Sequence, residues 1–182
     1  MRRKDILALA GEMAALHGRD PFSAARAQGV RVAFYPFRDL PGMYGTVLGI
    51  PFIAIQSGLS PMAARVICAH EMGHHFLHRP VANVGFFGES LVVGGAGKLE
   101  REANLFAAEF LLSDGEVYEP LTVGISAEAI AQELSVPPEL VAVKILSLTE
   151  KGIAVEGDEP PARFLKNGVR MPENGNWSAD SL

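Results

Sequence analysis

The stretch His70-Glu71-Met72-Gly73-His74 has the HExxH pattern and carries more information than any other part of the chain. Four residues turn an α-helix by about 400°, so the second histidine lies only ~40° round from the first. Both imidazoles can then bind one metal ion, and Glu71 can act as a general base on a metal-bound water. Apolar residues flank the motif at Val66-Ile67 and Phe76-Leu77, which predicts a buried helix.

The residues after the motif exclude one class of metal site. Ser60-Pro61 is a typical helix start, and we expect this helix to reach about Leu77 and to be ended by Pro80. The extended pattern with a third histidine needs glycine and histidine at the positions of Leu77 and Pro80. A catalytic zinc site normally has three protein ligands, so the third ligand should be a carboxylate from a later helix.

Four glutamates follow within reach of the motif, and helix phase distinguishes three of them. A helix is predicted over 99–112, with Glu100, Glu102 and Glu109 on it. Glu100 lies only ~50° from the centre of its apolar face, whereas Glu102 and Glu109 lie over ~100° away and should face water. Because a buried carboxylate needs a partner, Glu100 is the best candidate ligand. Glu89 remains an alternative, but it lies in a glycine-rich loop.

Two segments together resemble the ImmA/IrrE family of metallo-endopeptidases. They are the motif with its continuation to His78, and Glu100–Leu112, which matches a family pattern of the form E-x-x-A-N-x-F-A-A-x-x-L-[LM]. The resemblance implies a gluzincin-like α+β core and a Zn²⁺ ion held by His70, His74 and Glu100, with Glu71 as catalytic base. It also implies a protein substrate, often a helix-turn-helix transcriptional repressor encoded nearby.

Further residues are candidates for supporting roles. Asn104, one turn after Glu100, could hold that ligand in place. The oxyanion of the reaction needs a donor, and candidate oxyanion or substrate contacts are Tyr35, Tyr44, His75 and His78. His78 lies ~80° round and ~12 Å along the helix from His70, so we expect a cation at the helix C-terminus rather than another ligand.

The remaining pattern predicts an α+β fold in which a small three-stranded sheet packs on a helical bundle, and the resemblance implies that this fold is zincin-like. That bundle carries the motif helix and the second ligand helix. The expected elements are a helix at 3–17 closed near Gly18, a strand at 30–35, two short strands or a hairpin within 43–56, and helices at 126–135 and 137–149. Residues 81–98 are rich in glycine and form either a crossing loop or a flap. We expect one metallopeptidase domain at 1–156 and an extended or poorly ordered tail at 157–182.

Composition limits the partners and the compartment. A net charge of −5 argues against nucleic acid as the main partner, and the single cysteine, Cys68, fits a reducing cytoplasm. No apolar run approaches the roughly 20 residues of a membrane span. Residues 130–141 have the cadence of a helix-turn-helix, but the second helix lacks a base-reading surface and is expected to pack. The alternative to a peptidase is a non-catalytic metal-dependent binding or sensor module, and oligomeric state stays open.

Overall fold

The computed structural model describes residues 1–82 and 96–155. Within these ranges the elements in chain order are α1 (Arg3–His17), α2 (Pro21–Ala27), β1 (Arg31–Tyr35), β2 (Gly42–Val47), β3 (Ile50–Gln56), α3 (Pro61–Ala82), α4 (Ala96–Leu111), α5 (Asp114–Thr122), α6 (Ala127–Leu134) and α7 (Pro138–Glu150).

The three strands form one sheet in the order β1-β3-β2. β2 and β3 are the predicted hairpin: they pair antiparallel, and Leu48 and Gly49 between them both have positive φ, as in a type I′ turn. β1 pairs parallel with β3, so the sheet is mixed. β1 and β2 are its two edge strands.

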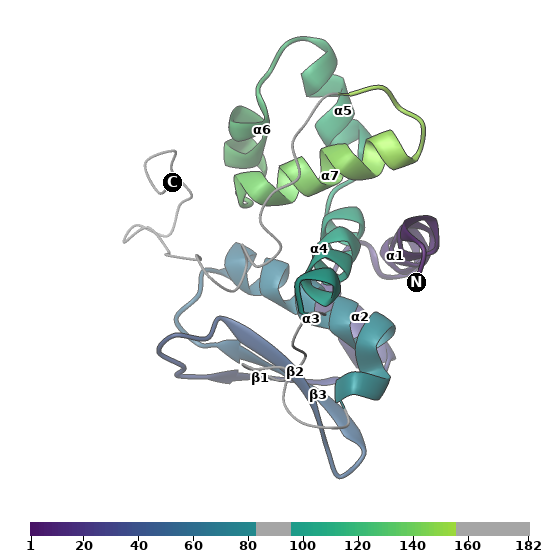
Figure 1. Ribbon diagram of the computed structural model, residues 1–182. Coiled ribbons are helices and arrows are strands. Elements are labelled where there is room, and N and C mark those ends of the chain that lie inside the picture. The colour runs from purple at the N-terminus through teal and green to yellow at the C-terminus, as the bar shows by residue number, and fades with distance from the viewer. Residues whose placement is uncertain (83–95, 156–182) are drawn as a thin grey trace.

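The sheet and the helices form successive layers, which Figure 1 shows with the sheet at the bottom of the view. α3 packs on β2 and β3, and α4 packs on α3. α1 and α7 then cover other sides of α4, and α5 and α6 pack against α7. The predicted α+β fold with a three-stranded sheet and two adjacent motif-bearing helices is therefore confirmed.

Two glycines allow α3 to approach its neighbours closely. A Cβ built on Gly73 would lie 3.0 Å from Ala103 Cα and 3.1 Å from its carbonyl oxygen, so α3 and α4 are almost in backbone contact there. A Cβ on Gly42 would overlap Ile67 Cγ2, so strand β2 lies directly against the side chains of α3. The centre of the HExxH motif therefore lies between a strand and a helix, with no room for larger residues.

Several predicted boundaries were wrong. α3 continues past Pro80 to Ala82, and α4 begins at Ala96, so the ends of the predicted 81–98 loop are helical. Proline costs a helix one hydrogen bond but does not always end it when the helix is packed on both sides. The roles suggested for residues 83–95, including Glu89, and for the tail from 156 onward lie outside the described residues.

Two helices were not predicted. α2 begins after Asp20, whose carboxylate accepts a hydrogen bond from the Phe22 N–H, and has proline at its first position. α5 begins after Ser113, where a capping box joins Ser113 and Glu116. The polar stretch at 113–115 is thus the start of a helix.

α7 packs as expected of the second helix in the helix-turn-helix-like segment. Its buried residues include Leu140, Val141 and Ile145, and it lies against α4, α5 and α6. No helix among the described residues is long and apolar enough to cross a membrane.

Candidate metal centre

Three side chains from two helices converge in the buried centre of the molecule. His70 and His74 come from successive turns of α3, and Glu100 comes from the first part of α4. His70 Nε2 lies 3.2 Å from His74 Nε2 and 3.3 Å from Glu100 Oε2, and His74 Nε2 lies 3.5 Å from Glu100 Oε1. The helix-phase prediction that Glu100 points inward is confirmed, since it is only 6% exposed.

The distances among these atoms fit a tetrahedral metal ion. Ligand atoms ~2.05 Å from zinc at tetrahedral angles lie ~3.3 Å from one another, which is close to the three observed separations. The donor set of two imidazoles and one carboxylate is one that zinc accepts, and it leaves a fourth position for water. Two ring nitrogens and a carboxylate facing one another in a buried site are well suited to a cation between them.

Glu71 is buried beside this cluster, on the sheet side of α3. It is 1% exposed, and a Cβ built on Gly42 of strand β2 would lie 3.5 Å from Glu71 Cγ. The carboxylate is therefore held between the motif helix and an edge strand. Asn104 is buried one turn after Glu100 on α4, and its suggested support of that ligand stays a prediction.

His78 is not the exposed cation expected at the end of the helix. It is buried, because α3 continues past it, and both of its ring nitrogens have partners. His78 Nδ1 lies 3.0 Å from His74 Nδ1, and His78 Nε2 lies 2.9 Å from Glu102 Oε2. Burial lowers the pKa of His78 by more than the hydrogen bond with Glu102 raises it, so the ring is neutral near pH 7.

The remaining candidates form a buried pair and an exposed ring. Tyr44 and His75 are buried, with the Tyr44 hydroxyl 3.0 Å from His75 Nδ1. Burial lowers the pKa of His75 to about 4, with a smaller contribution from Arg79, and burial also raises the pKa of Tyr44. Tyr35 is half exposed on β1 and stacks on Phe37. Their suggested oxyanion or substrate roles stay predictions.

The two glutamates expected to face water do not. Glu109 is buried and forms ion pairs of 2.7 Å with Lys144 and 2.6 Å with Lys151. The Glu102 side chain is only 12% exposed. The phase argument was wrong for both because it assumed a single buried face, whereas α4 is enclosed by α1, α3 and α7. Sequence reasoning thus missed Glu102 as a contact of His78. The sequence held one sign that His78 belongs with the buried site, because His70, His74 and His78 recur every fourth residue.

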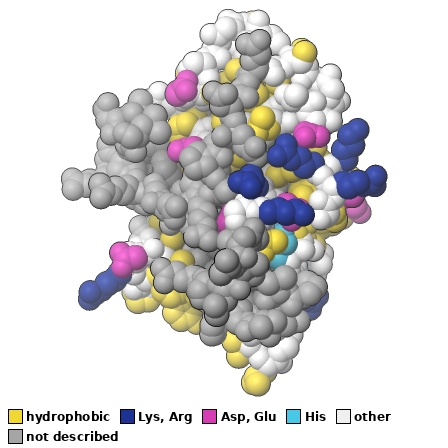
Figure 2. Space-filling view, in the orientation of Figure 1, with side chains coloured by type: hydrophobic (Ala, Val, Ile, Leu, Met, Phe, Trp, Pro, Cys, Tyr) yellow, Lys and Arg dark blue, Asp and Glu magenta, His cyan; other side chains and the backbone are white. Residues whose placement is uncertain are grey.

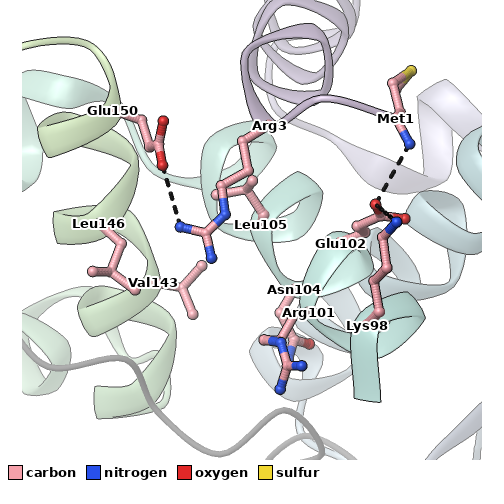
Figure 3. A pocket seen from close by; sticks show the side chains of 10 residues that line it. All are labelled: Met1, Arg3, Lys98, Arg101, Glu102, Asn104, Leu105, Val143, Leu146 and Glu150. Atoms are coloured by element: carbon pink, nitrogen blue, oxygen red, sulfur yellow. Dashed lines mark hydrogen bonds and ion pairs between the residues drawn. The ribbon is translucent and has the colours of Figure 1, made fainter. Parts of the chain in front are cut away.

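A cavity of about 270 Å³ opens on the far side of α4 from the sheet. Figure 2 shows Lys and Arg side chains gathered around a histidine on one face of the molecule, with acidic groups among them. Figure 3 shows Glu102 in the cavity wall, paired with the N-terminal amine of Met1 at 3.6 Å and with Lys98 Nζ at 3.9 Å. Glu102 therefore contacts the buried His78 on one side and lines a solvent-accessible cavity on the other.

Comparison with known proteins accounts for this geometry. The family model described as the IrrE N-terminal-like domain, of the M78 peptidases, matches residues 25–146. The chain belongs to this peptidase family. The match includes both helices that carry the cluster, so the resemblance of the two motifs to ImmA/IrrE proteins is confirmed.

Two curated relatives agree with this family. "Uncharacterized immunity region protein 2" of Bacillus phage phi105 is 38% identical over 109 residues, covering 60% of this chain and 68% of the relative. "Metallopeptidase ImmA" of Bacillus subtilis (strain 168) is 40% identical over 73 residues, covering 39% of this chain and 42% of the relative. No solved structure matched the chain. The buried cluster is thus the candidate metal site of a metallopeptidase fold.

Proposed function

We propose that the protein is a zinc-dependent endopeptidase. The observation that carries the proposal is the convergence of His70, His74 and Glu100, whose ligand atoms all lie within 4.8 Å of one another in a buried site. Glu71, buried beside them in the same motif, is the proposed general base. Zinc is preferred over other divalent ions because of the two imidazoles and one carboxylate.

The metal and the Glu71 side chain have different proposed roles in the reaction. Zinc, when bound, supplies the activation of a water molecule and the polarisation of the scissile carbonyl. Glu71 takes the proton of that water and returns it to the leaving amine, a role for which a positioned carboxylate typically contributes 10²–10⁴-fold in rate. Burial of the site between β2 and α4 limits bulk water around the reacting groups.

The proposed substrate is a helix-turn-helix repressor encoded nearby. Support comes from the resemblance to ImmA/IrrE proteins and from the phage phi105 relative, whose name refers to an immunity region. A repressor encoded beside this gene is the first candidate to test for cleavage.

The first test is Glu71→Gln in purified, zinc-loaded protein. We expect one zinc per chain in both proteins by metal analysis, and a loss of repressor cleavage of ~10²–10⁴-fold in the variant, because glutamine cannot accept the proton. Glu133→Gln, an exposed position on α6, is the matched control and should cleave at the wild-type rate.

Two results would contradict the proposal. Wild-type cleavage by Glu71→Gln would exclude Glu71 as the base. Zinc-loaded wild-type protein that cleaved neither the repressor nor unfolded casein would favour a non-catalytic metal-dependent binding module.

A further inference from the structure

The two nitrogens of the His74 ring face different groups. Nε2 faces His70 and Glu100, in the cluster proposed to hold the metal. Nδ1, on the opposite side of the ring, lies 3.0 Å from His78 Nδ1. His78 is therefore in contact with the side of the ligand that faces away from the metal site.

The hydrogen-bonding capacity of Glu102 determines the proton positions along this chain of contacts. A carboxylate oxygen accepts hydrogen bonds, so His78 Nε2 donates its N–H to Glu102 Oε2 at 2.9 Å. The 3.0 Å contact between the two Nδ1 atoms needs one donor and one acceptor, and His78 Nδ1 accepts the N–H of His74 Nδ1. The lone pair of His74 is left on Nε2, the atom that faces His70 and Glu100.

Glu102 has two further partners outside the histidine pair. The carboxylate is near the N-terminal amine of Met1 and the Lys98 ammonium (Figure 3). Glu102 also follows Glu100 by two residues on α4, so one helix bears both the carboxylate of the cluster and the acceptor that orients His78. A displacement of this helix would disturb both contacts together.

We infer that His78 and Glu102 are positioning residues that hold His74 in the tautomer and orientation required for metal binding. The inference rests on the proposed function only in taking the buried cluster as a metal site. Neither residue contacts the reacting atoms; Glu102 acts through His78, and His78 acts through His74. Groups of this kind typically change metal affinity by 10–100-fold when they are removed.

The test measures zinc affinity in the full-length protein by competition with a chromophoric chelator. We expect Glu102→Gln to weaken binding about 10-fold and His78→Phe to weaken it by about 10–100-fold. His78→Gln should bind more tightly than His78→Phe, because an amide can accept from His74 and donate to Glu102. The absorption spectrum of the Co²⁺-loaded proteins reports any change in ligand geometry.

A double substitution distinguishes two cases. In the first, called the relay, Glu102 acts on His74 only through His78; in the second, the two residues have independent effects. In a relay, adding Glu102→Gln to His78→Phe causes no further loss, because Glu102 has no route to His74 once His78 is gone. Glu109→Gln is the matched control: it removes another buried carboxylate from α4, away from the cluster, and should lower stability while leaving zinc affinity unchanged.

The outcomes distinguish this inference from the proposed function. Wild-type zinc affinity in folded Glu102→Gln or His78→Phe, or losses that multiply in the double variant, would overturn the relay alone. Wild-type protein that bound no zinc would overturn the proposed function and the relay with it.

Discussion

Tyr44 and His75 illustrate how a residue beside the metal site can be structural. Both side chains are buried, and each is the hydrogen-bond partner of the other at 3.0 Å. Tyr44→Phe leaves a buried imidazole nitrogen without that partner, which should lower the free energy of unfolding by about 1–3 kcal/mol. We expect kcat to remain within a few-fold of wild type, and urea denaturation with steady-state assays checks both values.

Tyr44→Phe also tests the alternative role of this tyrosine as an oxyanion donor. Removal of one oxyanion donor typically costs ~10²–10³ in kcat. A loss of that size in folded Tyr44→Phe would show that the hydroxyl turns from His75 toward the substrate during the reaction, and the pair would then be catalytic.

At this scale the sequence predicted the convergence of His70, His74 and Glu100 well and the contacts around these residues poorly. His70, His74 and Glu100 follow from helix period and the cost of burying a carboxylate, which are local properties. The burial of Glu102 and Glu109 depends on which helices surround α4, and a single helix wheel carries no information about that. His78 was misplaced for a related reason, because Pro80 was given more weight than the packing of α3.

At the scale of elements, the crossing of α3 and α4 depends on Gly73. Gly73→Ala would place a methyl group 3.0 Å from Ala103 Cα, so the two helices would have to separate. Overpacking of this kind typically costs about 1–3 kcal/mol. Because each helix supplies ligands to the cluster, zinc affinity should fall together with the melting temperature.

Gly11→Ala is the matched control for this prediction. A Cβ at Gly11, in the middle of α1, would be 3.9 Å from its nearest neighbour, which is ordinary contact. The change should leave zinc affinity unaltered and raise stability by about 0.5–1 kcal/mol through helix propensity. Equal zinc affinity in Gly73→Ala and the wild type would show that the crossing tolerates a methyl group.

The junction of α4, α5 and α7 is held by a network of charges around the buried Lys144 and Glu109. Lys144 is fully buried, with its ammonium 2.7 Å from Glu109 and 2.6 Å from Asp114. Glu109→Gln removes the more buried of the two carboxylates that compensate this ammonium, and breaking a buried pair from one side typically costs about 3–5 kcal/mol. Chemical denaturation measures the loss, and Glu133→Gln on the exposed surface of α6 should stay within ~0.5 kcal/mol of wild type. A loss below ~1 kcal/mol would show that Asp114 and water compensate the Lys144 ammonium.

The same network makes stability depend on pH. Burial raises the pKa of Asp114, but hydrogen bonds from Lys144 and Lys151 outweigh burial, so the net shift is downward. A carboxylate with a lowered pKa stabilises the fold above its unfolded pKa of ~3.9 and loses that contribution as pH falls through the folded value. Melting temperatures measured from pH 6 to pH 3 should therefore fall less steeply in Asp114→Asn than in the wild type, and parallel curves would exclude this contribution.

Element prediction from sequence succeeded where the hydrophobic period was long. The helices of both motifs have clear periods, although their facing ends were misplaced. α1, β1 and the hairpin also have clear ends, and Gly18 closes α1 in the left-handed conformation as expected. α2 and α5 span only seven and nine residues, and their starts depend on side-chain caps at Asp20 and Ser113 rather than on an apolar stripe. Short capped helices of this kind resemble loops in composition, which is why both were missed.

At the scale of the whole molecule, the proposed metal would join the two layers that meet at its ligands. α3 lies on the sheet and α4 lies under α1 and α7, so a metal ligated by both helices links the sheet side to the helical side. Anything that binds the folded state alone raises its stability by RT ln(1 + [L]/Kd). Zinc should therefore stabilise the entire fold rather than one segment.

Chelation tests this coupling directly. With free zinc at 100 times Kd, the gain is ~2.7 kcal/mol, or roughly 5–11 °C in melting temperature for a chain of this size. EDTA should remove this increment from the wild type in a thermal scan, and added zinc should restore it. Glu100→Gln should melt at nearly the same temperature with and without zinc, because a neutral amide is a poor third ligand. An equal zinc-dependent shift in the melting temperature of Glu100→Gln would show that the third ligand lies elsewhere and that Glu100 of α4 does not bind the metal.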